Sequence, residues 1–291
     1  MVRHHVDLKR ELEELKKKAE GVFRPERRTF LHPEGGAPHM ERSLSCPEGA
    51  VRLADAVRGE EVAFGGGAFL RVLTEASAVW PEALTFHREY LEAIGSPFFP
   101  EGRAFEALRP LKSARPESVC YLDIETTGLR MSPLFLVGLM YGSEERLVVD
   151  QLFARDYSEE GTVLAYLAEL LPRFEILVTF NGITFDVPFI RERMTVHRLS
   201  FPAPATHIDI LPLSRLVVGA RTPNHRLQTL EMHLCARKRV GDIAGSEIPG
   251  AYHEFVRTQD ARDMAHIIHH NRLDLVTMLQ LVTIFLSGRS E

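Results

Sequence analysis

Two carboxylates lie one residue apart in the stretch Cys120-Tyr121-Leu122-Asp123-Ile124-Glu125-Thr126-Thr127-Gly128-Leu129. The run that leads to them is apolar, which predicts a buried strand. Residues i and i+2 of a strand point to the same face, so Asp123 and Glu125 project together while Leu122 and Ile124 pack into the core. Two like charges held this close in a partly buried place are unfavourable unless a cation lies between them. The alternative interpretation is an edge strand with a solvated acidic face.

Carboxylate oxygens on a rigid element suit hard divalent cations. Mg²⁺ and Mn²⁺ prefer such ligands, and two of these ions together can drive hydrolysis of a phosphodiester bond. We therefore expect Asp123 and Glu125 to take part in binding Mg²⁺ or Mn²⁺, with two ions in the complete site.

The segment Asp123-Ile124-Glu125-Thr126-Thr127-Gly128-Leu129 resembles the first motif of the DEDD exonuclease superfamily, the DnaQ-like branch of the ribonuclease H-like fold. Two later segments resemble the second and third motifs in the expected order: Phe180-Asn181-Gly182-Ile183-Thr184-Phe185-Asp186 and His269-His270-Asn271-Arg272-Leu273-Asp274. The resemblance covers residues 116–287 and implies four metal ligands, namely Asp123, Glu125, Asp186 and Asp274. Read alone, Asp186 would be an ordinary helix N-cap and Asp274 an exposed helix residue.

Within the superfamily, the chain is most similar to the YprB-type ribonuclease H-like proteins. The likeness lies in Arg239-Val240-Gly241-Asp242-Ile243-Ala244-Gly245, in Glu247-Ile248-Pro249 and in the His-Asn-x-x-Asp ending of the third motif. The resemblance implies a metal-dependent 3′–5′ exonuclease that hydrolyses DNA or RNA from a 3′ end by a two-metal mechanism, with DNA repair as a candidate setting. The alternative is a catalytically inactive module of the same fold that binds nucleic acid or a helicase partner.

Two histidines compete for the role of general base. The superfamily uses a His five residues before the last Asp or a Tyr four residues before it, and here His269 and His270 occupy those two positions. At about 100° per residue, a side chain four residues back lies about 40° from Asp274 around a helix, and one five back about 140°. The apolar spacing of Met264 and Ile267 predicts that the helix already runs there, which favours His270. His269 would face the site only if the helix began near residue 270.

Candidate substrate contacts follow the first two motifs. The resemblance implies that Thr126-Thr127-Gly128-Leu129 contacts the terminal nucleotide through backbone N–H groups and a wedge side chain, and that Asn181 contacts the sugar–phosphate. The sequence does not choose between DNA and RNA, because the contact that would read the 2′-hydroxyl is not identified.

Composition bounds these interpretations. The chain has 291 residues, 45% of them hydrophobic and 26% charged, with a net charge of −5, so nucleic acid would be bound by local basic patches rather than by overall basicity. Its three cysteines have no CxxC spacing, which predicts neither a disulfide framework nor a zinc site and fits a cytoplasmic protein. No apolar run is long enough to suggest a signal peptide or a membrane span.

The pattern along the chain predicts two parts with a boundary near residue 115. Residues 1–115 read as a helical and irregular region, and residues 116–291 as a ribonuclease H-like exonuclease domain. The first part is expected to hold an amphipathic helix at 6–20, irregular structure at 24–50, a turn at 65–67, mostly helix at 68–95 and a linker at 97–116.

Strands and helices alternate in the second part. Strands are predicted at 119–125, 135–141, 146–152, 176–180 and 207–211, and helices at 161–174, 186–196 and 261–287. This order predicts an α/β fold: a ribonuclease H-like mixed sheet flanked by helices, preceded by a smaller N-terminal region.

Overall fold

The computed structural model describes residues 49–129, 131–239 and 241–288. All of them belong to one compact unit, Leu44–Glu291. The amphipathic helix expected at 6–20 lies outside the described residues, as does almost all of the segment at 24–50.

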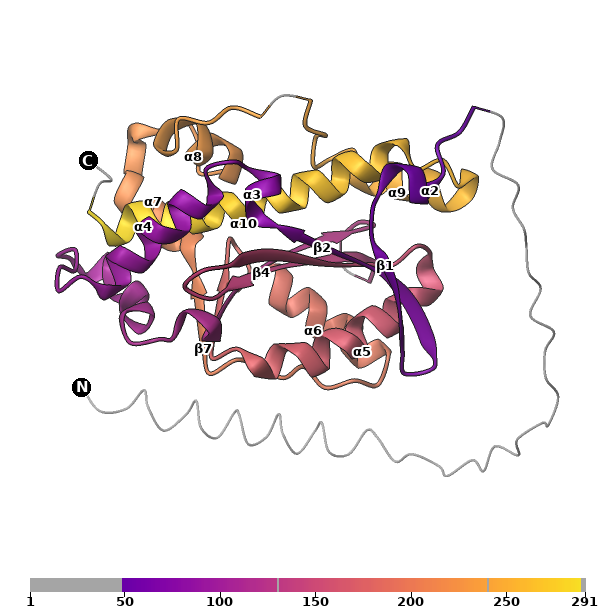
Figure 1. The fold of residues 1–291 in the computed structure, drawn as a ribbon, viewed down its shortest axis with the longest axis horizontal. Coiled ribbons are helices and arrows are strands. Elements are labelled where there is room, and N and C mark those ends of the chain that lie inside the picture. Colours follow the sequence, from indigo (N-terminus) through magenta and orange to yellow (C-terminus); the bar gives the residue numbers. More distant parts are fainter. Residues whose placement is uncertain (1–48, 130, 240, 289–291) are drawn as a thin grey trace, which may run out of the picture. The chain divides into compact units, whose positions relative to one another are not determined.

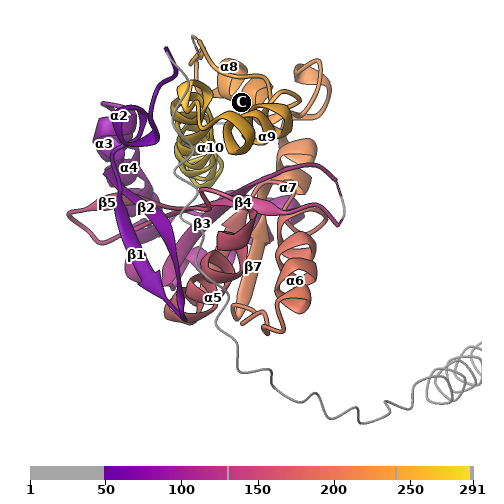
Figure 2. The same cartoon turned by 90° about the vertical axis from the view of Figure 1, so that its right-hand side faces the viewer.

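A seven-stranded mixed sheet forms the centre of this unit (Figures 1 and 2). The strands lie in the order β1-β2-β5-β4-β3-β6-β7. Neighbours from β1 to β3 pair antiparallel, whereas β3–β6 and β6–β7 pair parallel. The strands are β1 (Glu60–Phe64), β2 (Gly67–Glu75), β3 (Val119–Thr126), β4 (Leu134–Gly142), β5 (Leu147–Phe153), β6 (Ile176–Thr179) and β7 (Thr206–Asp209).

Helices cover both faces of the sheet, which confirms the predicted α/β class (Figure 2). The long helix α10 lies on one face, and α5 and α6 lie on the other. None of the helices in the described ranges has the length and hydropathy that a membrane span requires. The helices are α2 (Leu53–Ala56), α3 (Ala76–Val79), α4 (Ala83–Gly95), α5 (Glu160–Leu170), α6 (Asp186–Val196), α7 (Ile210–Val218), α8 (Leu227–Leu234), α9 (Ile248–Thr258) and α10 (Arg262–Leu286).

Strand β3 divides its side chains between two hydrophobic clusters. Leu122 and Ile124 pack with apolar residues of α5 and α6, whereas Val119 and Tyr121 pack with apolar residues of α10. Because side chains alternate along a strand, the odd-numbered residues of β3 face α10. The two carboxylates of the first motif therefore point toward the helix that carries the third motif.

The sheet begins well before residue 116, so the structure has no break at the boundary expected near residue 115. Strands β1 and β2 form a hairpin, and β2 pairs antiparallel with β5. The expectation of helix across 68–95 is wrong for its first part, since Gly67–Glu75 is a strand. Gly65 and Gly66 form the predicted turn; both have positive φ, which a two-residue hairpin turn needs and glycine adopts without strain.

The segment expected to be a linker is also packed. Residues Arg103–Lys112 form a 3₁₀ helix, and its Leu108 and Leu111 are fully buried in the same hydrophobic cluster as α10. Proline-rich sequence suggested a flexible connection, but two leucines three residues apart supply an apolar face that anchors it.

Candidate nuclease site

The four carboxylates singled out in the sequence come from three elements. Asp123 and Glu125 lie near the end of β3, Asp186 is the first residue of α6, and Asp274 lies in α10. The residue before α6, Phe185, occupies the N-cap position, so Asp186 is not the N-cap of this helix.

Loop geometry before α6 sets the position of Asp186. The backbone N–H groups of Asn181 and Ile183 donate to the two carboxylate oxygens of Asp209, at 2.8 and 3.1 Å. Asn181 has a φ of +67°, a conformation that Asn tolerates better than most residues. Asp209 also caps α7 by accepting from the backbone N–H of Leu211.

Burial and mutual repulsion act on three of these carboxylates. Burial, followed by the charges of Asp274, Glu125 and Asp186, raises the pKa of Asp123 well above its ordinary value. The pKa of Glu125 is raised in the same way, by burial and then by the charges of Asp274 and Asp186. Burial raises the pKa of Asp186 to about 7. The sequence-predicted ligands therefore lie near enough to repel one another.

Helix α10 is continuous through the third motif, so His270 faces the carboxylates. Its Nε2 lies 3.5 Å from Oδ2 of Asp274, one turn further along, and the His270 side chain is buried. His269 is exposed. The predicted continuity of the helix is confirmed, and with it the orientation of His270.

A buried arginine that was not expected at the site binds Asp274. Arg239 donates from Nη2 to Oδ1 of Asp274 at 2.5 Å and from Nε to Oε2 of Glu231 at 2.7 Å. It also lies 3.2 Å from Oδ2 of Asp242 through Nη1. The guanidinium of Arg239 therefore contacts three carboxylates, of which that of Glu231 is fully buried. Its positive charge lowers the pKa of Glu125 and so opposes burial and the neighbouring carboxylates, which raise it.

His270 has a second carboxylate partner on its other ring nitrogen. Nδ1 lies 2.9 Å from Oδ1 of Asp242. An ionised carboxylate can only accept, so the Nδ1 that faces Asp242 is the donor of this hydrogen bond. Burial alone would raise the pKa of Asp242, but His270 and Arg239 together lower it.

Three of the four site residues that were not predicted, all except Glu231, lie within motifs of the sequence. Arg239 and Asp242 belong to the stretch used for the subgroup resemblance, and Asn271 lies inside the third motif. Asn271 donates from Nδ2 to Oδ2 of Asp123 at 2.8 Å. The polar character of Arg239, Asp242 and Asn271 within short motifs could have indicated a role at the site. Glu231 lies outside these motifs, so no sequence pattern indicated its role.

The expected substrate-contacting residues divide into two kinds. The hydroxyls of Thr126 and Thr127 hold the loop together by donating to the carbonyls of Gly128 and Pro133, at 2.7 and 3.0 Å. Leu129 projects into solvent with 81% of its surface exposed.

The donor set fits a hard divalent cation. Several carboxylates that raise one another's pKa gain from a cation between them, and carboxylate oxygens are the ligands that Mg²⁺ and Mn²⁺ prefer. In the conformation described, no three His, Cys, Asp or Glu side chains of residues 49–129, 131–239 and 241–288 are already close enough to form a metal-binding group. Oδ1 of Asp274 is bound by Arg239, which leaves Oδ2 as the oxygen for a metal.

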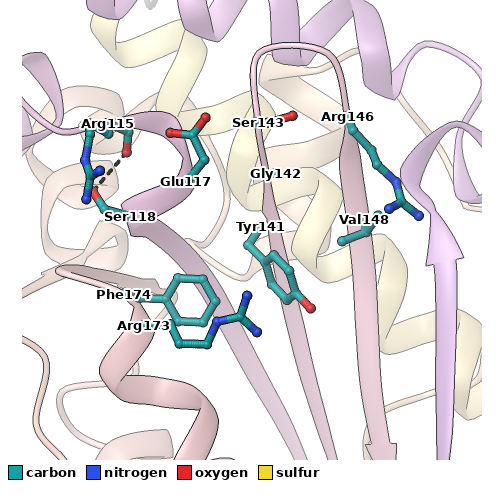
Figure 3. Close-up of a pocket in the computed structure, with 10 residues that line it drawn as sticks. All are labelled: Arg115, Glu117, Ser118, Tyr141, Gly142, Ser143, Arg146, Val148, Arg173 and Phe174. Atoms are coloured by element: carbon teal, nitrogen blue, oxygen red, sulfur yellow. Dashed lines mark hydrogen bonds between the residues drawn. The ribbon is translucent and has the colours of Figure 1, made fainter.

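A separate hollow lies at the opposite end of the strands (Figure 3). Its volume is about 360 Å³, and its lining includes Arg115, Arg146 and Arg173 around the rings of Tyr141 and Phe174. Arg146 and Arg115 are paired with Glu75 and Glu175, at 2.7 and 3.6 Å, so much of their charge is already balanced. This hollow is not part of the carboxylate site, because the carboxylates lie at the other end of β3.

Two comparisons with known proteins found similar chains. The chain is 28% identical over 176 residues to the uncharacterized protein YprB of Bacillus subtilis (strain 168), a match that covers 58% of this chain and 42% of that protein. It therefore spans less than half the length of this relative. A solved structure, the family B DNA polymerase from the hyperthermophilic archaeon Pyrobaculum calidifontis, is similar with a TM-score of 0.44 and 16% identity over 56% of this chain and 24% of that one.

One family match covers more than half of the sequence. Residues 120–286, from β3 to the last residue of α10, match the sequence model of the RNase_H superfamily. This range includes all four carboxylates, His270, Arg239 and Asp242. The chain therefore belongs to the RNase_H superfamily.

Proposed function

We propose that this protein is a metal-dependent 3′–5′ exonuclease that hydrolyses phosphodiester bonds of DNA or RNA. Asp123, Glu125, Asp186 and Asp274 are its proposed metal ligands. The observation that carries the proposal is the meeting of these carboxylates with a buried histidine whose Nε2 lies 3.5 Å from Oδ2 of Asp274. Membership of the RNase_H superfamily supports a nuclease.

The metal chemistry is that of two Mg²⁺ or Mn²⁺ ions. When bound, they would neutralise the phosphate and lower the pKa of the attacking water. Asp123 is the proposed bridging ligand, because its carboxylate lies among the charges of all three others.

His270 is the proposed general base. Asp242 accepts the proton on Nδ1, which fixes the tautomer in which Nε2 can take a proton from the attacking water. Asp242 would also stabilise the imidazolium that forms. His269 is the weaker candidate, because it is exposed on another side of the helix.

The substrate end would lie on the loops that follow β3 and β6. Backbone N–H groups of Thr126-Thr127-Gly128-Leu129 and the side chain of Asn181 are the proposed contacts with the terminal nucleotide. The exposed Leu129 would pack against its base. A helicase partner, as part of a DNA repair setting, remains a further proposal.

One observation favours a second candidate, an inactive module that binds nucleic acid or a helicase partner. Arg239 already binds Asp274 at 2.5 Å, and a resident guanidinium there could replace a metal ion. Against it, Glu231 and Asp242 also hold Arg239, and Oδ2 of Asp274 is not bound by it.

The test is a nuclease assay on 5′-labelled single- and double-stranded DNA and RNA with Mg²⁺, Mn²⁺ or EDTA. We expect shortening from the 3′ end that requires the metal and stops at a 3′-phosphorothioate or blocked end. Asp186→Asn should remove it, whereas Asp263→Asn, an exposed carboxylate in the first turn of α10, should not. Retained binding of nucleic acid without any metal-dependent cleavage would favour the inactive module instead.

A further inference from the structure

Three residues form a row across the middle of the sheet beside the proposed bridging ligand. Gly138 of β4 pairs directly with Asp123 of β3 on one side and with Gln151 of β5 on the other. Residues directly opposite in neighbouring strands share a face, so the row runs from a carboxylate over a glycine to an amide, under α10. The glycine leaves a gap in the middle of this row.

The side chain of Asn271 fills that gap from α10. It is fully buried, and a Cβ at residue 138 would lie 2.0 Å from its Oδ1 and 2.7 Å from its Cγ. Residue 138 is not among those with positive φ, so its backbone would accept alanine. The close approach of Asn271, rather than backbone conformation, is therefore what requires glycine here.

The hydrogen bonds around Asn271 have a fixed direction. Arg272 can only donate, and its Nε lies 2.6 Å from Oε1 of Gln151. The other end of the Gln151 amide, Nε2, must then donate, and it does so to Oδ1 of Asn271 at 2.8 Å. That leaves Nδ2 of Asn271 to face Asp123, where it donates to Oδ2 at 2.8 Å.

We propose that Asn271 is a positioning residue that fixes the carboxylate of Asp123 for metal binding. This inference rests on the proposed function, because Asp123 is the proposed bridging ligand. The donation from Arg272 fixes the orientation of the Gln151 amide, and Gln151 in turn fixes that of the Asn271 amide. The absence of a side chain at Gly138 leaves space for the Asn271 amide. Oδ1 of Asp123 stays free of Asn271 and remains available as a ligand.

The structure offers a pair of substitutions that separates packing from positioning. Asn271→Ala leaves a cavity over Gly138, and Gly138→Ala alone forces the buried amide to move. In the double variant Asn271→Ala/Gly138→Ala, the new methyl group enters the space that the amide vacated. Gln151 keeps an acceptor in that variant, the carbonyl of Ile268 at 2.9 Å.

Two measurements on the full chain test the inference, namely Tm in EDTA and Mn²⁺ affinity by EPR titration. We expect both single variants to lower Tm and the double variant to recover most of the loss. Mn²⁺ affinity should nevertheless fall about 10–100-fold in Asn271→Ala and stay low in the double variant, the usual effect of losing a group that orients a metal ligand. Recovery of affinity together with Tm would overturn the inference, because packing alone would then explain the site.

A crystal structure of the metal-free double variant tests the same point without metal. We expect the carboxylate of Asp123 to turn away from its position in the wild type or to occupy more than one orientation. An unchanged, single orientation would overturn the inference whatever the metal does. A wild-type protein that binds no Mn²⁺ would instead overturn the proposed function, and the crystal structure would still decide the role of Asn271.

Discussion

The carboxylates on the two sides of the site, the β3 strand side and the α10 helix side, have different kinds of partner. On the strand side, Asp123 is held by the uncharged amide of Asn271, and its pKa is raised by burial and by the neighbouring carboxylates. On the helix side, Asp274 is bound by the guanidinium of Arg239, and His270 by the carboxylate of Asp242. Asp123 on the strand side therefore has an uncharged partner, whereas Asp274 on the helix side has a cationic one.

This difference indicates how the site can fold before metal is bound. The arginine and the histidine–carboxylate pair hold the helix side in place, and the carboxylates whose pKa is raised are those of β3 and the start of α6. Substitutions on the two sides should accordingly change the stability of the metal-free protein in opposite directions. Removing a charge from the strand side should stabilise it, and removing a charge from the helix side should destabilise it.

The largest effect is expected for Asp123→Asn on the strand side. It should abolish cleavage, because it removes the proposed bridging charge without changing shape. In EDTA its Tm should be slightly higher than that of the wild type, since one source of repulsion is gone. Undiminished cleavage, measured with the 5′-labelled substrates, would contradict the two-metal mechanism.

On the helix side, His270→Ala should lower kcat about 10²–10⁴-fold, the range expected for loss of a general base. Mn²⁺ affinity should be largely kept. His269→Ala is the matched control: it changes the neighbouring, exposed histidine and should cost much less. Small and equal effects on kcat would mean that no protein base is used.

Arg239→Gln should destabilise the protein by about 3 kcal/mol in free energy of unfolding, since it leaves the buried carboxylate of Glu231 without its closest cation. Arg257→Gln removes an arginine whose pair with Glu254 is exposed and screened by solvent, and it should cost much less. Urea unfolding in EDTA measures both. Equal costs would show that the helix side is not held by its own cation.

The smallest effect is a pH dependence of stability in EDTA. The folded-state pKa values of Asp123, Glu125 and Asp186 are raised, that of Asp186 from 3.8 to about 7. The folded state therefore binds more protons than the unfolded state in this window, and their contribution to stability is lost as pH rises from about 4 through 7. We expect the Tm advantage of Asp123→Asn over the wild type to grow from pH 5 to pH 8. A constant difference would show that Asp123 does not lose its proton in this window.

Local patterns in the sequence were enough to predict much of the fold. The alternation in β3 and the helical spacing of α10 follow from periodicity, and the bounds of α6 agree with a helix whose first turn accepts Pro188. The orientation of His270 followed from the same helical geometry. These features depend on neighbours in sequence, which a single chain displays directly.

The features that were missed depend on contacts between distant residues. Residues 68–75 contain apolar side chains that suit helix or strand, and only pairing with β5 makes them a strand. Glu231, Arg239 and Asp274 meet through tertiary packing, and no spacing rule links them. The need for glycine at residue 138 of an apolar strand comes from the close approach of the Asn271 side chain, which lies far away in the sequence.

The hairpin of β1 and β2 has a consequence for any shorter version of this protein. Every residue of β5 is buried, and β2 covers one of its two edges. A fragment starting at residue 116 would expose a seven-residue edge, five residues of it apolar, with unpaired backbone groups, which is a template for intermolecular strand pairing and aggregation. In the structure the outermost strand at this end of the sheet is β1, a short strand that opens with the charged residues Glu60 and Glu61, and short, charged edge strands disfavour pairing between molecules.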